Sequence, residues 1–110
     1  MFLRQSENTA IIVGDEKISY NSLLERVSKY ASLFERDATK KIAIYCENRV
    51  EWVYSLFSGM MNESIIVPID YMLPPDDVSY ILNDCTPEVI FYSKETEERR
   101  EAVEGPRQDV

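Results

Sequence analysis

The side chains available for chemistry are limited first by the absence of histidine from all 110 residues. Without an imidazole, the chain cannot form Ser-His or Cys-His nucleophile pairs or most zinc and non-haem iron sites. Cys46 and Cys85 form no CxxC pair. We therefore expect two reduced core cysteines, one in a buried strand and one at a helix end.

Two further features of the composition exclude phosphate loops and polyanionic partners. The three glycines, Gly14, Gly59 and Gly105, are widely separated, whereas a phosphate-binding loop needs several close backbone N–H groups without Cβ atoms. Twelve basic residues against twenty acidic ones give a net charge of -8, which repels nucleic acid and anionic lipid headgroups. We expect no nucleic-acid partner.

The length and the apolar pattern predict one domain over residues 1–110. A chain of this length buries roughly two-thirds of its unfolded surface, so it needs no disulfide or metal to fold. The longest apolar stretches, Ala10 to Val13 and Ile65 to Ile69, are too short to span a bilayer or to act as a secretory signal. We therefore expect no transmembrane segment and a cytoplasmic protein.

The beginning of the chain predicts a hairpin and then an amphipathic helix. Two β-branched and aromatic runs, Thr9–Val13 and Lys17–Tyr20, flank Gly14-Asp15-Glu16, which is typical of an antiparallel hairpin. From Ser22 to Arg36 the apolar residues recur at spacings of three and four, and Ser22-x-x-Glu25 fits a capping box.

Buried strands then alternate with helices. Lys41–Cys46 carries a continuous Ile-Ala-Ile-Tyr-Cys run without alternation, as in a parallel strand covered on both faces. Asn48-x-x-Glu51 predicts the start of the next helix. Ser64–Ile69 predicts a short strand, with Pro68 at its end or on an unpaired side because proline has no N–H.

The last third predicts a helix, a strand and a polar helix. Pro74-Pro75-Asp76-Asp77 suits a helix start, and apolar residues continue at helical spacing to Cys85, where Pro87 prevents continuation. Val89–Tyr92 predicts a third buried strand. Lys94–Glu104 predicts a solvated helix with the pairs Lys94/Glu98 and Glu95/Arg99, ended by Gly105-Pro106.

Together these elements predict an α/β fold, with an N-terminal antiparallel hairpin followed by a small parallel sheet and its crossover helices. Ligands of such sheets bind beyond the carboxyl ends of the strands. Three loops occupy that position, and we consider them the site candidates: Glu47-Asn48, Asp70-Tyr71 and Ser93-Lys94.

Each polar or aromatic residue in these loops also has a structural interpretation, which we favour. Asp70 could be a catalytic carboxylate, but aspartate at a strand end more commonly forms a turn. Asn48 and Glu51 have the spacing of helix caps, and Trp52 and Tyr20 are expected to pack rather than to hold a ligand. We therefore assign no catalytic, cofactor-binding or metal-binding residue in this chain.

The order of several short motifs resembles the N-terminus of the acyl-adenylate-forming enzymes, the AMP-dependent synthetase/ligase superfamily of acyl-CoA synthetases, luciferases and nonribosomal peptide adenylation domains. The resemblance covers roughly residues 8–96. Ser19-Tyr20 is similar to the Thr/Ser-Tyr before the family's first helix, and Met60 to Asp70 is similar to its Leu-Lys-Ala-Gly-x-x-x-Val-Pro-Ile-Asp segment. The remaining motifs are Thr9-Ala10, Ile18, Asn48-x-x-Glu51-Trp52 and Pro74 to Leu82.

The sequence departs from the family pattern at three positions. Asn62 and Glu63 stand where Ala and Gly are usual, and Ser22 stands where Glu is usual. Among family members the overall resemblance favours a long-chain fatty acyl-CoA synthetase, followed by an aryl-acid CoA ligase or an amino-acid adenylating enzyme.

The resemblance implies a parent enzyme that activates a carboxylic acid with ATP and Mg²⁺ to an acyl-adenylate and then transfers the acyl group to coenzyme A. The family's phosphate loop, its acidic ribose and metal residue and its catalytic C-terminal lysine lie beyond the matched region. We therefore expect an N-terminal fragment of the AMP-binding domain, inactive on its own and binding no cofactor itself.

Two other function classes remain open at this stage. A phosphoacceptor receiver domain has Asp-x-x-Met-Pro after its central strand, which Asp70 to Pro74 approaches, but it also needs a carboxylate pair for Mg²⁺, and Glu47-Asn48 offers one carboxylate. The other class is a stand-alone structural or interaction domain. Because three apolar strands need more helical cover than one fragment offers, we also expect self-association, most simply as a homodimer.

Overall fold

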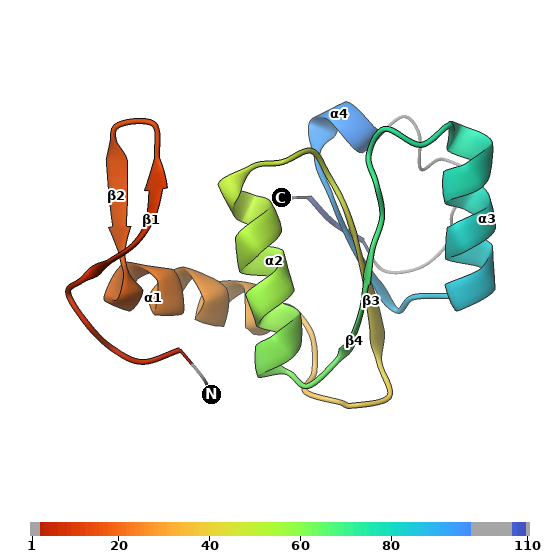
Figure 1. Cartoon of the computed structure of the whole chain (residues 1–110). Coiled ribbons are helices and arrows are strands. Elements are labelled where there is room, and N and C mark those ends of the chain that lie inside the picture. The colour runs from red at the N-terminus through yellow and green to blue at the C-terminus, as the bar shows by residue number, and fades with distance from the viewer. Residues whose placement is uncertain (1–2, 98–106, 110) are drawn as a thin grey trace.

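The computed structural model describes residues 3–97 and 107–109. Strands β1 (Thr9–Val13) and β2 (Glu16–Ser19) form the predicted antiparallel hairpin, with Val13 opposite Glu16. Gly14 adopts a φ of +58° in the turn, a conformation that glycine accepts without steric cost. The hairpin projects from one end of the molecule (Figure 1).

Helix α1 (Tyr20–Ala31) begins earlier and ends earlier than the sequence predicts. Its cap is Ser19, whose side-chain oxygen accepts the backbone N–H of Ser22 at 3.1 Å. The predicted capping box at Ser22 is therefore wrong, because the serine three residues upstream takes that position. Its buried residues, Leu23, Val27 and Ala31, form one face, as the apolar spacing predicts.

The parallel sheet has the strand order β4-β3-β5-β6. Its strands are β3 (Lys41–Tyr45), β4 (Ile65–Pro68), β5 (Val89–Tyr92) and β6 (Arg107–Asp109). Strand β3 is central, and its residues from Ile42 to Tyr45 are fully buried, as predicted. Strand β4 lies at an edge, so Ile65 is 47% exposed and the expectation of burial on both faces is wrong there. The sequence analysis did not predict β6.

Helices α2 (Val50–Met61) and α3 (Pro75–Cys85) lie on opposite faces of this sheet (Figure 1). On the α3 face, Val78 and Leu82 pack with Ala43, Tyr45 and Ile90. On the other face lies a second core cluster, in which Ile42 and Phe91 pack against Tyr30 and Phe34 of the α1 segment. The predicted crossover architecture is confirmed. Apolar side chains at alternate strand positions point to opposite faces of the sheet and pack into two separate core clusters.

The start of α2 differs from the prediction, whereas the start of α3 agrees with it. Arg49 is the N-cap residue of α2, without a side-chain capping bond, so Asn48 does not cap this helix. Helix α3 begins at Pro75 after Pro74, as predicted, because the missing proline N–H needs no partner in the first turn.

The described part of the C-terminal segment begins with α4 (Lys94–Glu97). The rest of the predicted polar helix, including the partners Glu98 and Arg99, lies outside the described residues. No helix within residues 3–97 is long and apolar enough to cross a membrane.

Candidate functional site

The chain leaves two neighbouring strands toward opposite faces of the sheet. After β3 it passes to α2, and after the adjacent β4 it passes to α3 (Figure 1). A crevice opens at the carboxyl ends of parallel strands where such a switch occurs, and ligands of open α/β sheets bind there. A pocket of about 260 Å³ occupies this position. We call it the switch-point crevice.

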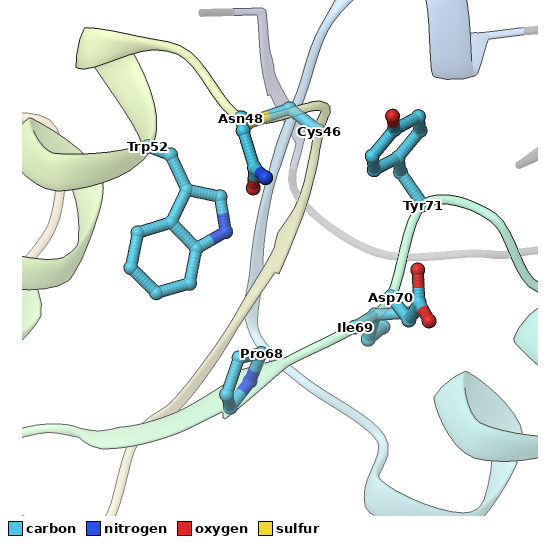
Figure 2. A pocket seen from close by; sticks show the side chains of 7 residues that line it. All are labelled: Cys46, Asn48, Trp52, Pro68, Ile69, Asp70 and Tyr71. Atoms are coloured by element: carbon cyan, nitrogen blue, oxygen red, sulfur yellow. The ribbon is translucent and has the colours of Figure 1, made fainter.

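Two of the three predicted loops form this crevice. Figure 2 shows its seven lining residues, which come from the end of β3, the entry to α2, and the end of β4 with its following loop. They are Cys46, Asn48, Trp52, Pro68, Ile69, Asp70 and Tyr71. The shared edge of parallel strands therefore brings the Glu47-Asn48 and Asp70-Tyr71 loops together, as expected.

Asp70 shapes the turn that follows β4. One of its carboxylate oxygens, Oδ1, accepts the backbone N–H of Met72 at 2.9 Å, and its carbonyl accepts the N–H of Leu73 at 3.2 Å. The first bond is that of an Asx turn and the second closes a β-turn, which agrees with the structural interpretation of Asp70. Because β4 is an edge strand, Asp70 does not follow a central strand, and the resemblance to a phosphoacceptor aspartate fails.

Trp52 lines the crevice, a role that the sequence analysis did not assign to it. Its side chain is half-buried, and in Figure 2 the indole projects into the crevice opposite Tyr71. Tyr20 is 36% exposed at the start of α1 and does not belong to the core, so it is not a core aromatic within the described residues. Helical spacing placed Trp52 correctly on α2, but its neighbour across the crevice comes from a distant segment.

The third predicted loop makes a separate polar contact beside the crevice. Ser93 Oγ donates a hydrogen bond to Glu47 Oε2 at 2.5 Å, and Arg49 Nη1 donates to Glu47 Oε1 at 3.2 Å. Burial pushes the pKa of Glu47 up, but the bonds from Ser93 and Arg49 outweigh it and lower that pKa below its usual value. Glu47 is therefore an ionised structural acceptor rather than a proton donor at neutral pH.

Glu51 also has a partner other than the predicted one. Its Oε1 accepts hydrogen bonds from Arg49 Nη2 at 2.6 Å and Nε at 3.0 Å. Arg49 thus joins Glu47 and Glu51 at the start of α2, and the predicted Asn48–Glu51 capping box is absent. The spacing of Asn48 and Glu51 was compatible with a capping box, but α2 starts one residue later, so Arg49 is its N-cap residue.

The two cysteines are free thiols in different environments. Cys46 is buried at the base of the crevice, and burial raises the pKa of its thiol to about 12. Cys85 is only partly buried, and burial again raises its pKa. Because the thiolate is the reactive form, Cys46 is not an activated nucleophile, and its predicted core role is confirmed.

Within the described residues we find no group of side chains assembled to hold a nucleoside triphosphate and its Mg²⁺. Several basic side chains that could hold phosphate already lie within 3.7 Å of a carboxylate: Arg26, Lys29, Arg36, Lys40 and Arg49. In the part of the chain that the structure describes, no three His, Cys, Asp or Glu side chains gather as metal ligands. We therefore derive no phosphate or metal chemistry from this chain.

Comparison with protein families gives a match over almost the whole chain. The family model described as "AMP-binding enzyme" matches residues 3–110.

Several curated relatives also match. Fumosorinone synthetase of Cordyceps fumosorosea is 29% identical over 106 residues, covering 94% of this chain and 3% of the relative. D-alanine–D-alanyl carrier protein ligase of Staphylococcus haemolyticus is 28% identical, covering 83% of this chain and 19% of the relative. The chain thus spans a small part of the curated relatives it matches.

Solved structures share the fold at low sequence identity. O-succinylbenzoate coenzyme A synthetase from Bacillus subtilis, in complex with AMP, superposes with a TM-score of 0.81 at 17% identity, over 94% of this chain and 28% of that chain. MatB from Rhodopseudomonas palustris gives a TM-score of 0.83 at 17% identity, over 94% and 22%. The hairpin and the sheet with its helices are therefore a recurring arrangement.

Proposed function

Because this chain belongs to the AMP-binding enzyme family, we propose that it is the N-terminal part of an ATP-dependent acyl-CoA synthetase. The observation that carries the proposal is the family match over residues 3–110. The fold shared with coenzyme A ligases over 94% of the chain supports it. The longer protein would join a carboxylic acid to AMP, releasing pyrophosphate, and then transfer the acyl group to the thiol of coenzyme A.

In this proposal the chain itself acts as a scaffold. Its few isolated glycines and its paired basic side chains do not suit ATP, so the nucleotide and Mg²⁺ would bind to other segments of the longer protein. This chain would contribute the buried strand β3, the polar contacts at the carboxyl end of that strand, and the surfaces that support later segments. The isolated 110-residue chain would then catalyse neither adenylation nor thioester formation.

A long-chain fatty acid is the first choice of substrate, followed by an aryl acid or an amino acid. Relatives named for coenzyme A ligation support thioester formation, among them 4-hydroxybutyrate–CoA ligase 2 of Metallosphaera sedula, 28% identical over 80 residues. A relative from Aspergillus clavatus named polyketide synthase-nonribosomal peptide synthetase favours the amino-acid alternative. A stand-alone interaction domain is the second function class, and exposed apolar side chains such as that of Ile65 favour it.

The test uses the longer reading frame that contains this chain. We expect the purified product to form a coenzyme A thioester with one class of acid when palmitate, benzoate and a mixture of amino acids are supplied separately with MgATP. Transfer of an amino acid to a carrier-protein thiol, with none to coenzyme A, would replace the synthetase proposal by the amino-acid alternative. A stop codon directly after Val110 would favour the stand-alone domain.

A further inference from the structure

The C-terminal end of helix α2 holds the segment that connects α1 to β3. We propose that Asn62 and Glu63 form a latch at this end, which keeps the connecting segment, residues 32–40, closed against α2 and which salt loosens. The latch consists of the side chain and carbonyl of Asn62 and of an ion pair between Glu63 and Arg36. It is independent of the proposed synthetase function.

Asn62 ties α2 to the end of α1 through its side-chain amide. Its Nδ2 donates to the carbonyl of Ala31 at 2.9 Å and to the carbonyl of Phe34 at 3.2 Å. The last carbonyls of a helix have no partner within that helix, so Asn62 supplies a donor to α1 from the end of a different helix. Because Asn62 is only 7% exposed, water replaces these bonds poorly when the side chain is removed.

The carbonyl of Asn62 holds the middle of the connecting segment by accepting the N–H of Asp37 at 3.2 Å. Asp37 organises the residues that follow it. Its carboxylate accepts the N–H of Thr39 at 2.8 Å, and its carbonyl accepts the N–H of Lys40 at 3.1 Å. The Lys40 carbonyl then accepts the N–H of Ile65, the first residue of β4, at 2.8 Å. The connecting segment is thus attached to the end of α2 and the start of β4 at successive points.

Glu63 adopts a backbone conformation that a side chain disfavours. Its φ is +59°, in the left-handed region that glycine enters without steric cost. The helix end requires this conformation because it is a Schellman motif. In this motif the Ser64 N–H donates to the Gly59 carbonyl at 2.9 Å, and the Glu63 N–H donates to the Met60 carbonyl at 3.1 Å. Glu63 therefore carries local strain, which an interaction of its side chain can offset.

Arg36 provides that interaction. Its Nη2 lies 2.6 Å from Glu63 Oε1, and the guanidinium lowers the pKa of Glu63 below its usual value. The two side chains are 65% and 59% exposed, so dissolved ions screen their attraction. The ion pair between Glu35 and Lys40 joins two residues of the connecting segment itself. The salt-sensitive link from the segment to α2 is therefore the pair of Arg36 and Glu63.

Asn62 and Glu63 are also two of the three departures from the family pattern. The alanine and glycine that are usual at these positions carry neither an amide donor nor a charge, and glycine has no strain in the left-handed region. The latch is therefore a feature of this chain that the family pattern does not predict.

Amide hydrogen exchange followed by NMR tests the latch at the Asp37 N–H. The amide of Ile44, in the fully buried part of β3, reports global unfolding and serves as the internal reference. We expect Asn62→Ala to speed exchange at Asp37 roughly tenfold or more relative to Ile44, because two hydrogen bonds are lost. Asn83→Ala, the same substitution at an exposed position of α3, should leave this ratio unchanged. Equal acceleration at Asp37 and Ile44 in Asn62→Ala would show a global loss of stability and overturn the latch.

A mutant cycle tests the ion pair and its link to the strained backbone. Arg36→Gln and Glu63→Gln should each speed exchange at Asp37 about two- to fivefold relative to Ile44, and the double variant should show no further increase. Lys29→Gln, which breaks the Glu25–Lys29 pair on α1, should have no effect. Glu63→Gly removes both the strain and the partner of Arg36, so adding Arg36→Gln to it should change nothing.

Ionic strength gives an independent measurement of the same pair. Raising the NaCl concentration from about 20 mM to about 1 M should reproduce the effect of Arg36→Gln in the parent protein, because the Debye length falls to a few ångströms. The same change should have little effect on Glu63→Gly. An equal salt response in the parent and in Glu63→Gly, or additive effects of Arg36→Gln and Glu63→Gln, would contradict the proposed pair.

Discussion

The Ser93 hydroxyl at the end of β5 donates a 2.5 Å hydrogen bond to the Glu47 carboxylate at the end of β3. The two residues are 46 positions apart in the sequence. Strands β3 and β5 are direct neighbours, with Tyr45 paired to Tyr92, so this contact closes the ladder at its carboxyl end. Thr96 supports it, because its Oγ1 accepts the Ser93 N–H at 3.1 Å and donates to the Tyr45 carbonyl at 2.8 Å.

Replacing Ser93 with alanine should lower the free energy of unfolding by about 1–2 kcal/mol at pH 7, since a hydrogen bond to an ionised carboxylate is lost. The folded pKa of Glu47 is below its usual value. Its stabilisation is therefore present above the unfolded pKa and is lost as the pH falls through the folded pKa. Urea melts at several pH values should show the difference from the parent shrinking in acid. A difference that stays constant over the whole acid range in which the protein remains folded, or one matched by Ser79→Ala on α3, would contradict this role.

Gly59 allows α2 to lie directly on the sheet. A Cβ at this position would come within 2.5 Å of Ile42 Cδ1 and 3.0 Å of Ile66 Cγ1. Because Ile42 is fully buried, Gly59→Ala should destabilise the fold by about 1–3 kcal/mol through overpacking. The double variant with Ile42→Val, which removes Cδ1, should lose less than the sum of the two single variants. Strictly additive losses in thermal melts would show that this contact is not the cause.

The stability losses on removing the two candidate cap residues, Ser19 at α1 and Asn48 at α2, should follow the cap positions in the structure rather than those indicated by the sequence spacing. Ser19→Ala should cost about 1 kcal/mol, because Ser19 accepts the N–H of Ser22. Asn48→Ala should cost less than about 0.5 kcal/mol, because Asn48 makes no capping bond. Chemical denaturation of the two variants compares them directly, and a larger loss for Asn48→Ala would contradict the observed cap positions.

The sequence was sufficient for the elements whose pattern is local. The uninterrupted Ile-Ala-Ile-Tyr run predicted the central strand β3, and Pro74-Pro75 predicted the start of α3. The sequence left the start of α1 ambiguous, because Ser19 and Ser22 can both act as the N-cap residue of this helix. It missed β6, because Arg107-Gln108-Asp109 is polar and has no strand pattern of its own.

The candidate site was only partly predictable. Parallel strands end at one edge, so the proximity of the Glu47-Asn48 and Asp70-Tyr71 loops followed from the alternation of strands and helices. The position of Trp52 opposite Tyr71 could not be predicted from the sequence, because it depends on how α2 packs against β4. That packing is fixed by tertiary contacts such as the one at Gly59.

We propose that the chain self-associates through exposed apolar side chains rather than by pairing at the β4 edge. Ile65 N donates to the carbonyl of Lys40, just before β3, and Ile69 N donates to the carbonyl of Ile44 in β3. The backbone groups of the alternate residues Ile66 and Pro68 therefore point away from β3, and Pro68 has no N–H to give. Exposed apolar side chains, among them Ile65 at 47%, remain as the contact surface.

Light scattering coupled to size exclusion tests this proposal at micromolar concentration. We expect a species heavier than the 12.8 kDa monomer, shifted toward the monomer by Ile65→Lys. The control Asn83→Lys places the same charge at an exposed polar position of α3 and should leave the mass unchanged. A sharp monomer that binds no hydrophobic dye would contradict the proposal.

The most direct test of the account is exchange of labelled pyrophosphate into ATP, measured in parallel on the isolated chain and on the longer protein that contains it. We expect no exchange above the buffer blank with the isolated chain, because its residues do not suit ATP, and acid-dependent exchange with the longer protein. Exchange by the isolated chain would contradict the scaffold role. A longer protein inactive with palmitate, benzoate and every amino acid would contradict its assignment to an acid-activating ligase.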